Sequence, residues 1–231
     1  MQYFLGIDIG TYESKGVLTD KEGNVIASAT HPHKMLVPEP GWAEHRPEED
    51  WWNDFVKITK KILKASKINP GDISCIATSA IGPCMLPVSY EGDPLMNAVL
   101  YGVDTRAENE IRELNEEVGE EKILQNCGNA LTSQSVGPKI LWLKKNCPEI
   151  FKRAGKILSS TSFLVQKLTG ESVIDHYTAA NFTPLYDIKN LKWTDALTKN
   201  IIEIERLPKL MWTTEIAGYV SKAASKETGL A

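Results

Sequence analysis

The stretch that decides the fold is residues 4–30, FLGIDIGTYESKGVLTDKEGNVIASAT. It contains three short runs, 4–9, 15–20 and 25–30, whose length and apolar content are typical of strands. Gly10 and the sequence KEGN that follows the second run supply the residues that tight turns need. The opening of the chain therefore predicts a β-meander rather than a strand–helix–strand unit.

The rest of the chain alternates between helix and strand patterns. A strand is expected over 73–79, and a hairpin over 85–88 and 98–101. The polar segment 171–193 is predicted to form turns. These patterns indicate an α/β fold with a mixed sheet flanked by helices. Apolar spacing predicts those helices over 48–66, 105–118, 136–146, 160–168, 195–202 and 220–228.

The composition is that of an ordinary globular protein. The 231 residues include 26 Lys and Arg against 30 Asp and Glu, a formal net charge of −4, and 42% are hydrophobic. These values exclude a disordered chain and a strongly basic nucleic-acid binder. No stretch approaches the roughly 20 apolar residues that cross a membrane, and Asp8 interrupts the first apolar run, so no targeting signal is expected. Four separated cysteines without a CxxC pair favour a reducing compartment, and the expected location is cytoplasmic.

The turn after the first strand carries the sharpest chemical signal. Gly10 permits a tight turn directly after Asp8, and Thr11, Ser14 and Lys15 add hydroxyls, N–H groups and a positive charge. Successive N–H groups on such a turn can bind an anion, and Asp8 could hold Mg²⁺ through water. An ordinary hairpin explains the same residues equally well. The sequence has neither GxxxxGK[ST] nor GxGxxG, the fingerprints of P-loop NTPases and Rossmann dehydrogenases.

The segment GWAEHRP at 41–47, with WW shortly after it, combines aromatic and charged residues. A tryptophan face packs against the C–H face of a sugar, and a carboxylate binds hydroxyls. Trp42 and Glu44 are therefore candidate ligand contacts. The alternative is a loop held to the core by its tryptophans, and this is the expected role of Trp52.

The remaining polar candidates have ordinary structural explanations. The segment YGVDTR at 101–106 lies where a strand gives way to a helix, and Asp104 is the expected helix N-cap. His31 and His33 flank a proline without a nearby cysteine, so a loop is expected there rather than a metal pair.

Taken in order, these segments resemble the FGGY carbohydrate kinases. DIGTYESK at 8–15 resembles the family's first phosphate motif, the 41–52 segment its GWxEqdP…WW motif, and YGVDTR its WxDxR motif with tyrosine for tryptophan. KILWLK at 139–144 and LTGE at 168–171 resemble two later motifs. The resemblance covers nearly the whole chain. It implies that residues 1–231 form one lobe of the ribonuclease-H-like fold of actin, hexokinase and Hsp70 ATPases, which the meander opening fits.

The resemblance also implies an ATP-dependent kinase of a small sugar or polyol. In this interpretation Asp8 is the catalytic residue that helps place Mg²⁺ and the transferred phosphate. ATP, Mg²⁺ and a small-molecule sugar or polyol are the expected ligands, no nucleic acid or membrane is expected as a partner, and a homo-oligomer is compatible with the sequence. The implied phosphate-loop residues are Gly10, Thr11, Ser14 and Lys15, and the implied substrate-binding residues are Trp42, Glu44, Gly82, Pro83, Tyr101, Asp104 and Arg106.

The sequence departs from the family pattern in two places. Xylulokinases tend to have GQMHG, and glycerol kinases an Arg-Glu pair, where residues 80–84 are AIGPC, so Gly82 and Pro83 offer none of the usual polyol hydrogen bonds. The family's general base, an Asp at the start of a second lobe, is expected beyond residue 231, as is the ATP-binding C-terminal lobe. We therefore expect the N-terminal lobe of a kinase, inactive alone. The alternative is a non-catalytic sugar-binding or regulatory module of the same fold.

Overall fold

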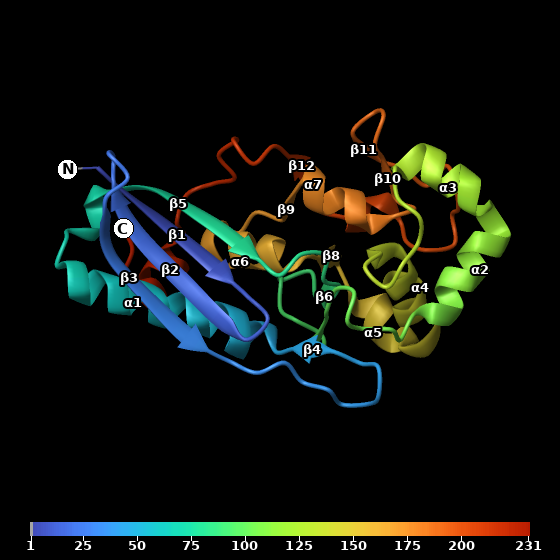
Figure 1. Cartoon of the computed structure of the whole chain (residues 1–231), viewed down its shortest axis with the longest axis horizontal. Helices are drawn as coiled ribbons and strands as arrows, with labels where there is room; N and C mark the ends of the chain where they lie inside the picture. Colours follow the sequence, from blue (N-terminus) through green and yellow to red (C-terminus); the bar gives the residue numbers. More distant parts are fainter. Residues whose placement is uncertain (1) are drawn as a thin grey trace.

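The opening meander forms most of a four-stranded sheet at one end of the molecule (Figure 1). In the computed structural model, which describes residues 2–231, β1 (Tyr3–Ile9), β2 (Glu13–Asp20) and β3 (Val25–Pro32) are consecutive antiparallel neighbours. β5 (Ile73–Ala80) pairs with the other edge of β1 and runs parallel to it, which gives the order β3-β2-β1-β5. The predicted meander and mixed sheet are confirmed.

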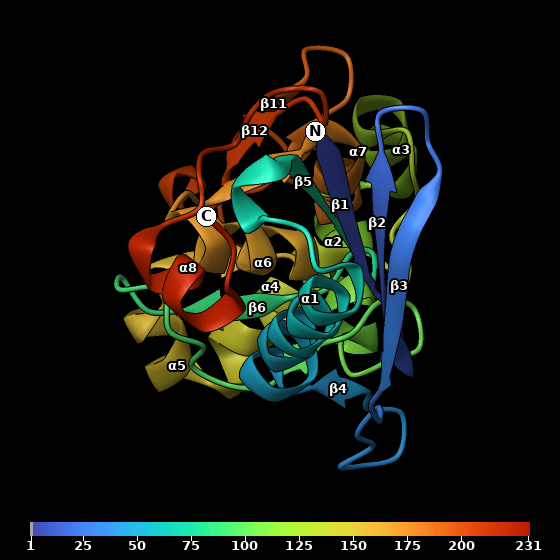
Figure 2. The same ribbon diagram turned by 90° about the vertical axis from the view of Figure 1, so that its left-hand side faces the viewer.

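Helix α1 (Asn53–Ser66) covers β2 and β3, and α8 (Lys222–Thr228) packs beside it (Figure 2). The close approach of α1 depends on Gly16, because a Cβ at that position would lie 2.4 Å from Cγ2 of Ile58. Helix α6 (Ser160–Thr169) contacts β5. Between sheet and helices lies a core that includes Leu5, Ile7, Ile9, Leu18, Phe55, Ile58, Ile62 and Phe163.

The predicted helix over 48–66 is divided in the structure. Its first part, η1 (Pro47–Trp52), is a π-helical turn that leads into α1. Trp52 is buried, stacks on Phe55 with ring centroids 5.5 Å apart, and donates its indole N–H to Glu227 at 2.8 Å. The expectation that this tryptophan holds the loop to the core is confirmed.

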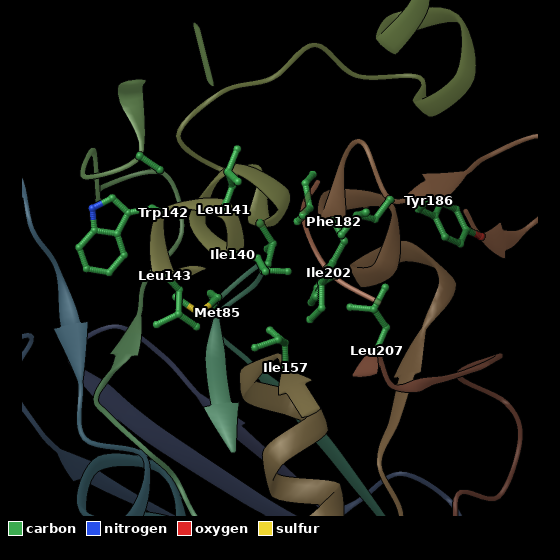
Figure 3. Packing of buried hydrophobic residues seen from close by; sticks show 14 of the residues in the cluster. Met85, Ile140, Leu141, Trp142, Leu143, Ile157, Phe182, Tyr186, Ile202 and Leu207 are labelled. Carbon is green, nitrogen blue, oxygen red and sulfur yellow. The ribbon is translucent and has the colours of Figure 1, made fainter. Parts of the chain in front are cut away.

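A second core lies at the other end of the molecule, among helices α2 (Glu108–Val118), α3 (Glu120–Cys127), α4 (Val136–Asn146) and α5 (Pro148–Arg153). Figure 3 shows side chains of α4 meeting residues from the later chain in this core. The residues that fill it include Met85, Ile140, Leu143, Ile157, Phe182, Ile202 and Leu207.

The remaining elements are short. Four pairs of short strands form two-stranded sheets: β4 (Glu44–His45) with β7 (Ala98–Val99), β6 (Leu86–Val88) with β8 (Lys156–Leu158), β9 (Val173–Asp175) with β12 (Lys209–Met211), and β10 (Tyr186–Asp187) with β11 (Lys192–Trp193). The remaining helical turns are η2 (Pro70–Asp72), α7 (His176–Ala179), η3 (Ala180–Phe182) and η4 (Ile204–Arg206). Within residues 2–231, no helix combines the length and apolar character required to cross a bilayer.

One further prediction of secondary structure is wrong, and another is confirmed only in part. The segment 195–202 forms bends instead of a helix. Its Thr198 hydroxyl donates to Glu117 and accepts from the N–H of Asn200, a local pattern that competes with helical hydrogen bonds. The expected hairpin is formed in part: Met85 bridges Val99 and Val88 bridges Pro94, both antiparallel, while β6 and β7 also pair with β8 and β4.

Candidate functional site

A hollow of about 380 Å³ lies where β1 and β5 end. The two strands are parallel, so their carboxyl ends meet at one edge of the sheet, which is where α/β folds commonly bind ligands. The pairing continues past the strands, since the N–H of Ile81 donates to the carbonyl of Ile9 at 2.9 Å. The lining residues are Asp8, Ile9, Gly10, Thr11, Ala80, Ile81, Gly82, Pro83, Tyr101 and Gln134.

The turn between β1 and β2 offers free backbone donors beside Asp8. Gly10 donates its N–H to the carbonyl of Glu13 at 3.1 Å, and a Cβ on Gly10 would lie only 2.7 Å from that oxygen. Glycine is therefore required for this tight turn. In the described part of the chain, the backbone N–H groups of Thr11 and Tyr12 have no hydrogen-bond acceptor. Consecutive unpaired N–H groups are the main feature of an anion-binding nest.

Two histidines hold the carbonyl groups of this same turn. The Nε2 atom of His33 lies 3.0 Å from the carbonyl oxygen of Gly10, and Nε2 of His45 lies 3.0 Å from that of Thr11. In a trans peptide the C=O and the following N–H point in opposite directions. Fixing these two carbonyls therefore directs the N–H groups of Thr11 and Tyr12 away from the histidines. The sequence analysis did not assign either histidine to the site.

The surroundings of the two histidines shift their pKa values in opposite directions. Burial lowers the pKa of His45 to about 4, with a further contribution from the charge on His33, so His45 is neutral at pH 7 and its Nδ1 accepts from the indole of Trp51 at 3.0 Å. Burial also disfavours the charged form of His33, but the hydrogen bond to Asp54 and the charge of that carboxylate outweigh it and raise the pKa of His33.

Ser14 and Lys15, which the sequence analysis placed in the phosphate loop, do not line the hollow. Ser14 is buried on β2 and donates its hydroxyl to Oδ2 of Asp54 at 2.8 Å. Lys15 is exposed on the same strand, opposite Asp8 in the β1–β2 register.

Tyr101 and Gln134 approach the hollow from the helical end of the molecule. The phenol oxygen of Tyr101 lies 3.1 Å from the hydroxyl of Thr11. Gly102 packs closely against Gln134: a Cβ added to Gly102 would lie 2.9 Å from Cγ of Gln134. The sequence analysis missed Gln134. It precedes α4 in a polar loop with no local motif, so only its position in the fold indicates a role.

Lys139 fixes the backbone next to Tyr101. Its buried ammonium group donates to the carbonyls of Leu100 and Tyr101, the latter at 3.0 Å. Burial lowers the pKa of Lys139 to about 8, although the Asp104 carboxylate opposes that shift. Lys139, the first residue of the KILWLK segment, therefore supports the site by holding the backbone at Tyr101 and does not itself line the hollow.

The other expected substrate residues form a separate buried cluster. The guanidinium of Arg106 lies over the Trp42 ring, 3.9 Å from its centre, and 5.0 Å from the centre of the Trp142 ring. Its Nη2 forms ion pairs with Glu44 at 2.9 Å and Asp104 at 2.8 Å. The cluster ties the segment that contains Trp42 and Glu44 to the segment after Tyr101.

The charged groups of this cluster are buried, while Trp42 is partly exposed. The side chains of Arg106 and Asp104 are 0% exposed, and that of Glu44 is 9% exposed. None of these residues, nor Trp42, lines the hollow. Asp104 is not the N-cap that the sequence predicted, because α2 begins at Glu108 with Ala107 as its N-cap. The Asp104 carboxylate instead accepts from the N–H groups of Ala43 and Arg106.

Comparison with solved structures identifies close relatives of this fold. Xylulose kinase from Rhodospirillum rubrum superposes with a TM-score of 0.92 at 26% identity, and the match covers 100% of this chain and 47% of that one. Glycerol kinase from Plasmodium falciparum, solved with ADP, gives a TM-score of 0.89 at 26% identity, again over 100% and 47% of the two chains. The expected kinase-lobe fold of the actin and hexokinase type is confirmed.

Sequence comparison gives the same result. Glycerol kinase from Thermococcus gammatolerans is 33% identical over 227 residues, which are 96% of this chain and 45% of that protein. Xylulose kinase from Lactococcus lactis is 29% identical over 226 residues, 95% of this chain and 43% of that protein. The chain thus spans about half the length of these relatives. Residues 3–231 match the N-terminal domain of the FGGY family of carbohydrate kinases, and the chain belongs to that family.

Proposed function

We propose that this chain is the sugar-binding lobe of a kinase that transfers a phosphoryl group from ATP to a hydroxyl of a small neutral sugar or polyol. The observation that carries the proposal is the arrangement at the end of β1. There Asp8, Gly10 and Thr11 line one hollow, and the N–H groups of Thr11 and Tyr12 on the same turn are unpaired. Phosphoryl transfer depends mainly on positioning and charge neutralisation. The N–H groups suit the positioning of phosphates, and the carboxylate suits a cation that neutralises their charge.

The turn suits the phosphates of ATP. The N–H groups of Thr11 and Tyr12 would donate to phosphate oxygens, as in other backbone nests. Lys15 is too far along β2 to line the hollow, so we assign it a long-range electrostatic role at most. Ser14 acts indirectly in this proposal, since its hydroxyl is committed to Asp54.

The chemistry of Asp8 fits Mg²⁺. No group of three or more His, Cys, Asp or Glu side chains that could hold a metal occurs within residues 2–231. Mg²⁺ is commonly bound by one or two carboxylates together with phosphates and water, so a single carboxylate in the hollow is a suitable ligand. Bound there, Mg²⁺ would neutralise charge on the phosphates, while Asp8 holds the ion next to the turn.

The lining of the hollow favours a neutral substrate. The phenol of Tyr101 and the amide of Gln134 can hydrogen-bond hydroxyls, and no Lys or Arg among residues 2–231 lines the space. Gly82 and Pro83 contribute surface but no side-chain hydrogen bond, so the substrate contacts differ from those of an Arg-Glu pair.

The buried cluster has a supporting role in this proposal. Arg106 and Asp104 hold the two segments that flank Tyr101, and Trp42 and Glu44 complete the same cluster. A substrate reaches Arg106 only if Trp42 or its loop moves, because the guanidinium is fully covered. Direct contact with the sugar or polyol is therefore assigned to Tyr101, Gln134, Gly82 and Pro83, while Asp8 is assigned to Mg²⁺. We also propose a cytoplasmic location, in keeping with four free cysteines.

An assay for phosphorylated products, carried out with the natural protein that contains this chain, tests the proposal. The protein is incubated with ATP, Mg²⁺ and a panel of neutral sugars and polyols, with their acidic derivatives as matched controls. The proposal predicts one ADP and one sugar phosphate per turnover for at least one neutral substrate. Sugar binding without any phosphorylated product would instead support a non-catalytic binding module.

A further inference from the structure

Outside the hollow, the strongest unexplained feature is a buried polar network behind the phosphate turn. His33 is 3% exposed at its side chain and Asp54 is 1% exposed. Nδ1 of His33 lies 2.9 Å from Oδ2 of Asp54, and its Nε2 lies 3.0 Å from the carbonyl oxygen of Gly10. Both ring nitrogens therefore face oxygen acceptors.

The charged ring satisfies both of these contacts at once. A neutral imidazole has one N–H and one lone pair, so one of its nitrogens would direct a lone pair at an oxygen. The imidazolium donates to both Asp54 and Gly10. Ser14 donates its hydroxyl to the same Asp54 oxygen, so the carboxylate is surrounded by donors and is held in place.

We propose that His33 is a positioning residue for the phosphate turn and that its positive charge sets the turn geometry. The charged ring joins Asp54 to the Gly10 carbonyl, which directs the N–H of Thr11 away from the core. When His33 loses a proton, the one that remains stays on Nδ1 beside the Asp54 carboxylate. Nε2 then no longer donates to the Gly10 carbonyl, and the anion nest loosens. This inference deepens the proposed function and rests on it for the identity of the anion.

Other charged groups around His33 are compatible with this role. His31 on the same strand places Nδ1 3.4 Å from the second oxygen of Asp54, and Asp50 in η1 also favours the charged form of His33. His45 lies 4.9 Å away, ring centre to ring centre, and stays neutral, so it does not compete for the proton. Protonated His33 with neutral His45 gives each carbonyl of the turn one N–H donor.

The direction of the pH effect follows from the raised pKa of His33. Below the ordinary histidine pKa the ring is charged and the turn is held. As the pH rises through the raised pKa, the turn is released and anion binding weakens. Phosphate binding by the turn is therefore expected to fall on the alkaline side.

An NMR titration of this chain tests whether the protonation of His33 changes the geometry of the phosphate turn. The ring signals of His33 and the backbone amide signals of Thr11 and Tyr12 should share one titration midpoint above the ordinary histidine value. Asp54→Asn should shift that midpoint down. His31→Gln is the matched control, because His31 contacts Asp54 but not the turn. In that variant the signals of His33, Thr11 and Tyr12 should still share one midpoint.

Pyrophosphate binding gives a second readout. The pyrophosphate affinity of wild type is divided by that of His33→Gln at each pH, because this ratio cancels the titration of pyrophosphate itself. The ratio should exceed one at pH 6 and approach one at pH 9. The inference is overturned if the turn amides ignore the titration of His33, or if His31→Gln and His33→Gln behave alike. If these tests succeed but the natural protein phosphorylates no sugar, the positioning role stands and the proposed function fails.

Discussion

Arg106 and Trp42 form the closest cation–π pair in the cluster behind the site, with the guanidinium carbon 3.9 Å from the ring centre. The same guanidinium neutralises the buried carboxylates of Glu44 and Asp104. Arginine suits this position because its planar group can stack on an aromatic ring and form several hydrogen bonds at once. The pair joins two loops that are distant in the sequence.

Removal of Arg106 is expected to destabilise the protein strongly. Arg106→Ala leaves two buried carboxylates without their cation, a loss of about 3–5 kcal/mol in the free energy of unfolding. Lys152→Ala is the matched control, because the Lys152–Glu149 pair is exposed and should contribute less than about 1 kcal/mol. Urea denaturation measures both. Equal effects of the two changes would contradict the supporting role of the cluster.

A methyl group at position 82 is expected to weaken substrate binding without affecting the fold. A Cβ on Gly82, which lines the hollow, meets no atom within 4 Å, so Gly82→Ala adds its methyl in open space. We expect a loss of affinity for the sugar of roughly tenfold and an unchanged melting temperature. Gly71→Ala, also sterically permitted but far from the hollow, is the control. An unchanged sugar affinity in Gly82→Ala would remove this residue from the site.

Gly10→Ala, unlike Gly82→Ala, should lower the stability of the protein as well as weaken binding. A Cβ on Gly10 would lie 2.7 Å from the backbone oxygen of Glu13, so Gly10→Ala must distort the turn. We expect a cost of about 1–3 kcal/mol in stability and loss of detectable pyrophosphate binding, measured by calorimetry. Retained binding with normal stability would show that the turn does not hold the phosphates.

Much of this fold and site could be predicted from the sequence. The alternating strands of residues 4–30, the glycine at the first turn and the aromatic anchor at Trp52 all depend on local chemistry, and each is found in the structure. The motifs also indicated Asp8, Gly10, Thr11 and Tyr101, which meet at one hollow.

The features of the site and fold that the sequence did not predict depend on contacts between distant segments. His33, His45 and Gln134 reach the site from separate segments, and no local pattern distinguishes them from ordinary loop residues. The 195–202 segment has helical spacing, but Thr198 bonds to Glu117, far away in the chain. The buried state of Arg106 likewise depends on Trp142, a partner that spacing alone does not reveal.

Acid should destabilise the protein partly through His45. Its folded pKa of about 4 lies below the ordinary value of 6.5, so the unfolded chain binds a proton first as the pH falls. The stability tied to neutral His45 is complete above about pH 6.5 and is lost toward pH 4, by about 3 kcal/mol. His33, whose pKa is raised, acts in the opposite direction and contributes most at low pH.

His45→Gln separates these effects, since glutamine retains a donor for the Thr11 carbonyl but does not titrate. Denaturation at pH 7 and pH 4.5 should show a smaller acid-induced loss in the variant than in wild type. An equal or larger loss in the variant would mean that His45 is not held neutral.

The measurement that tests the central claim most directly is the effect of Asp8→Asn on the natural protein that contains this chain. Sugar affinity and ATP-dependent sugar phosphorylation are measured side by side for wild type and variant. The proposed role of Asp8 predicts a fall in kcat of about 10²–10³, with sugar affinity unchanged. Full activity in Asp8→Asn would contradict it, because the carboxylate at the end of β1 would then have no part in phosphoryl transfer.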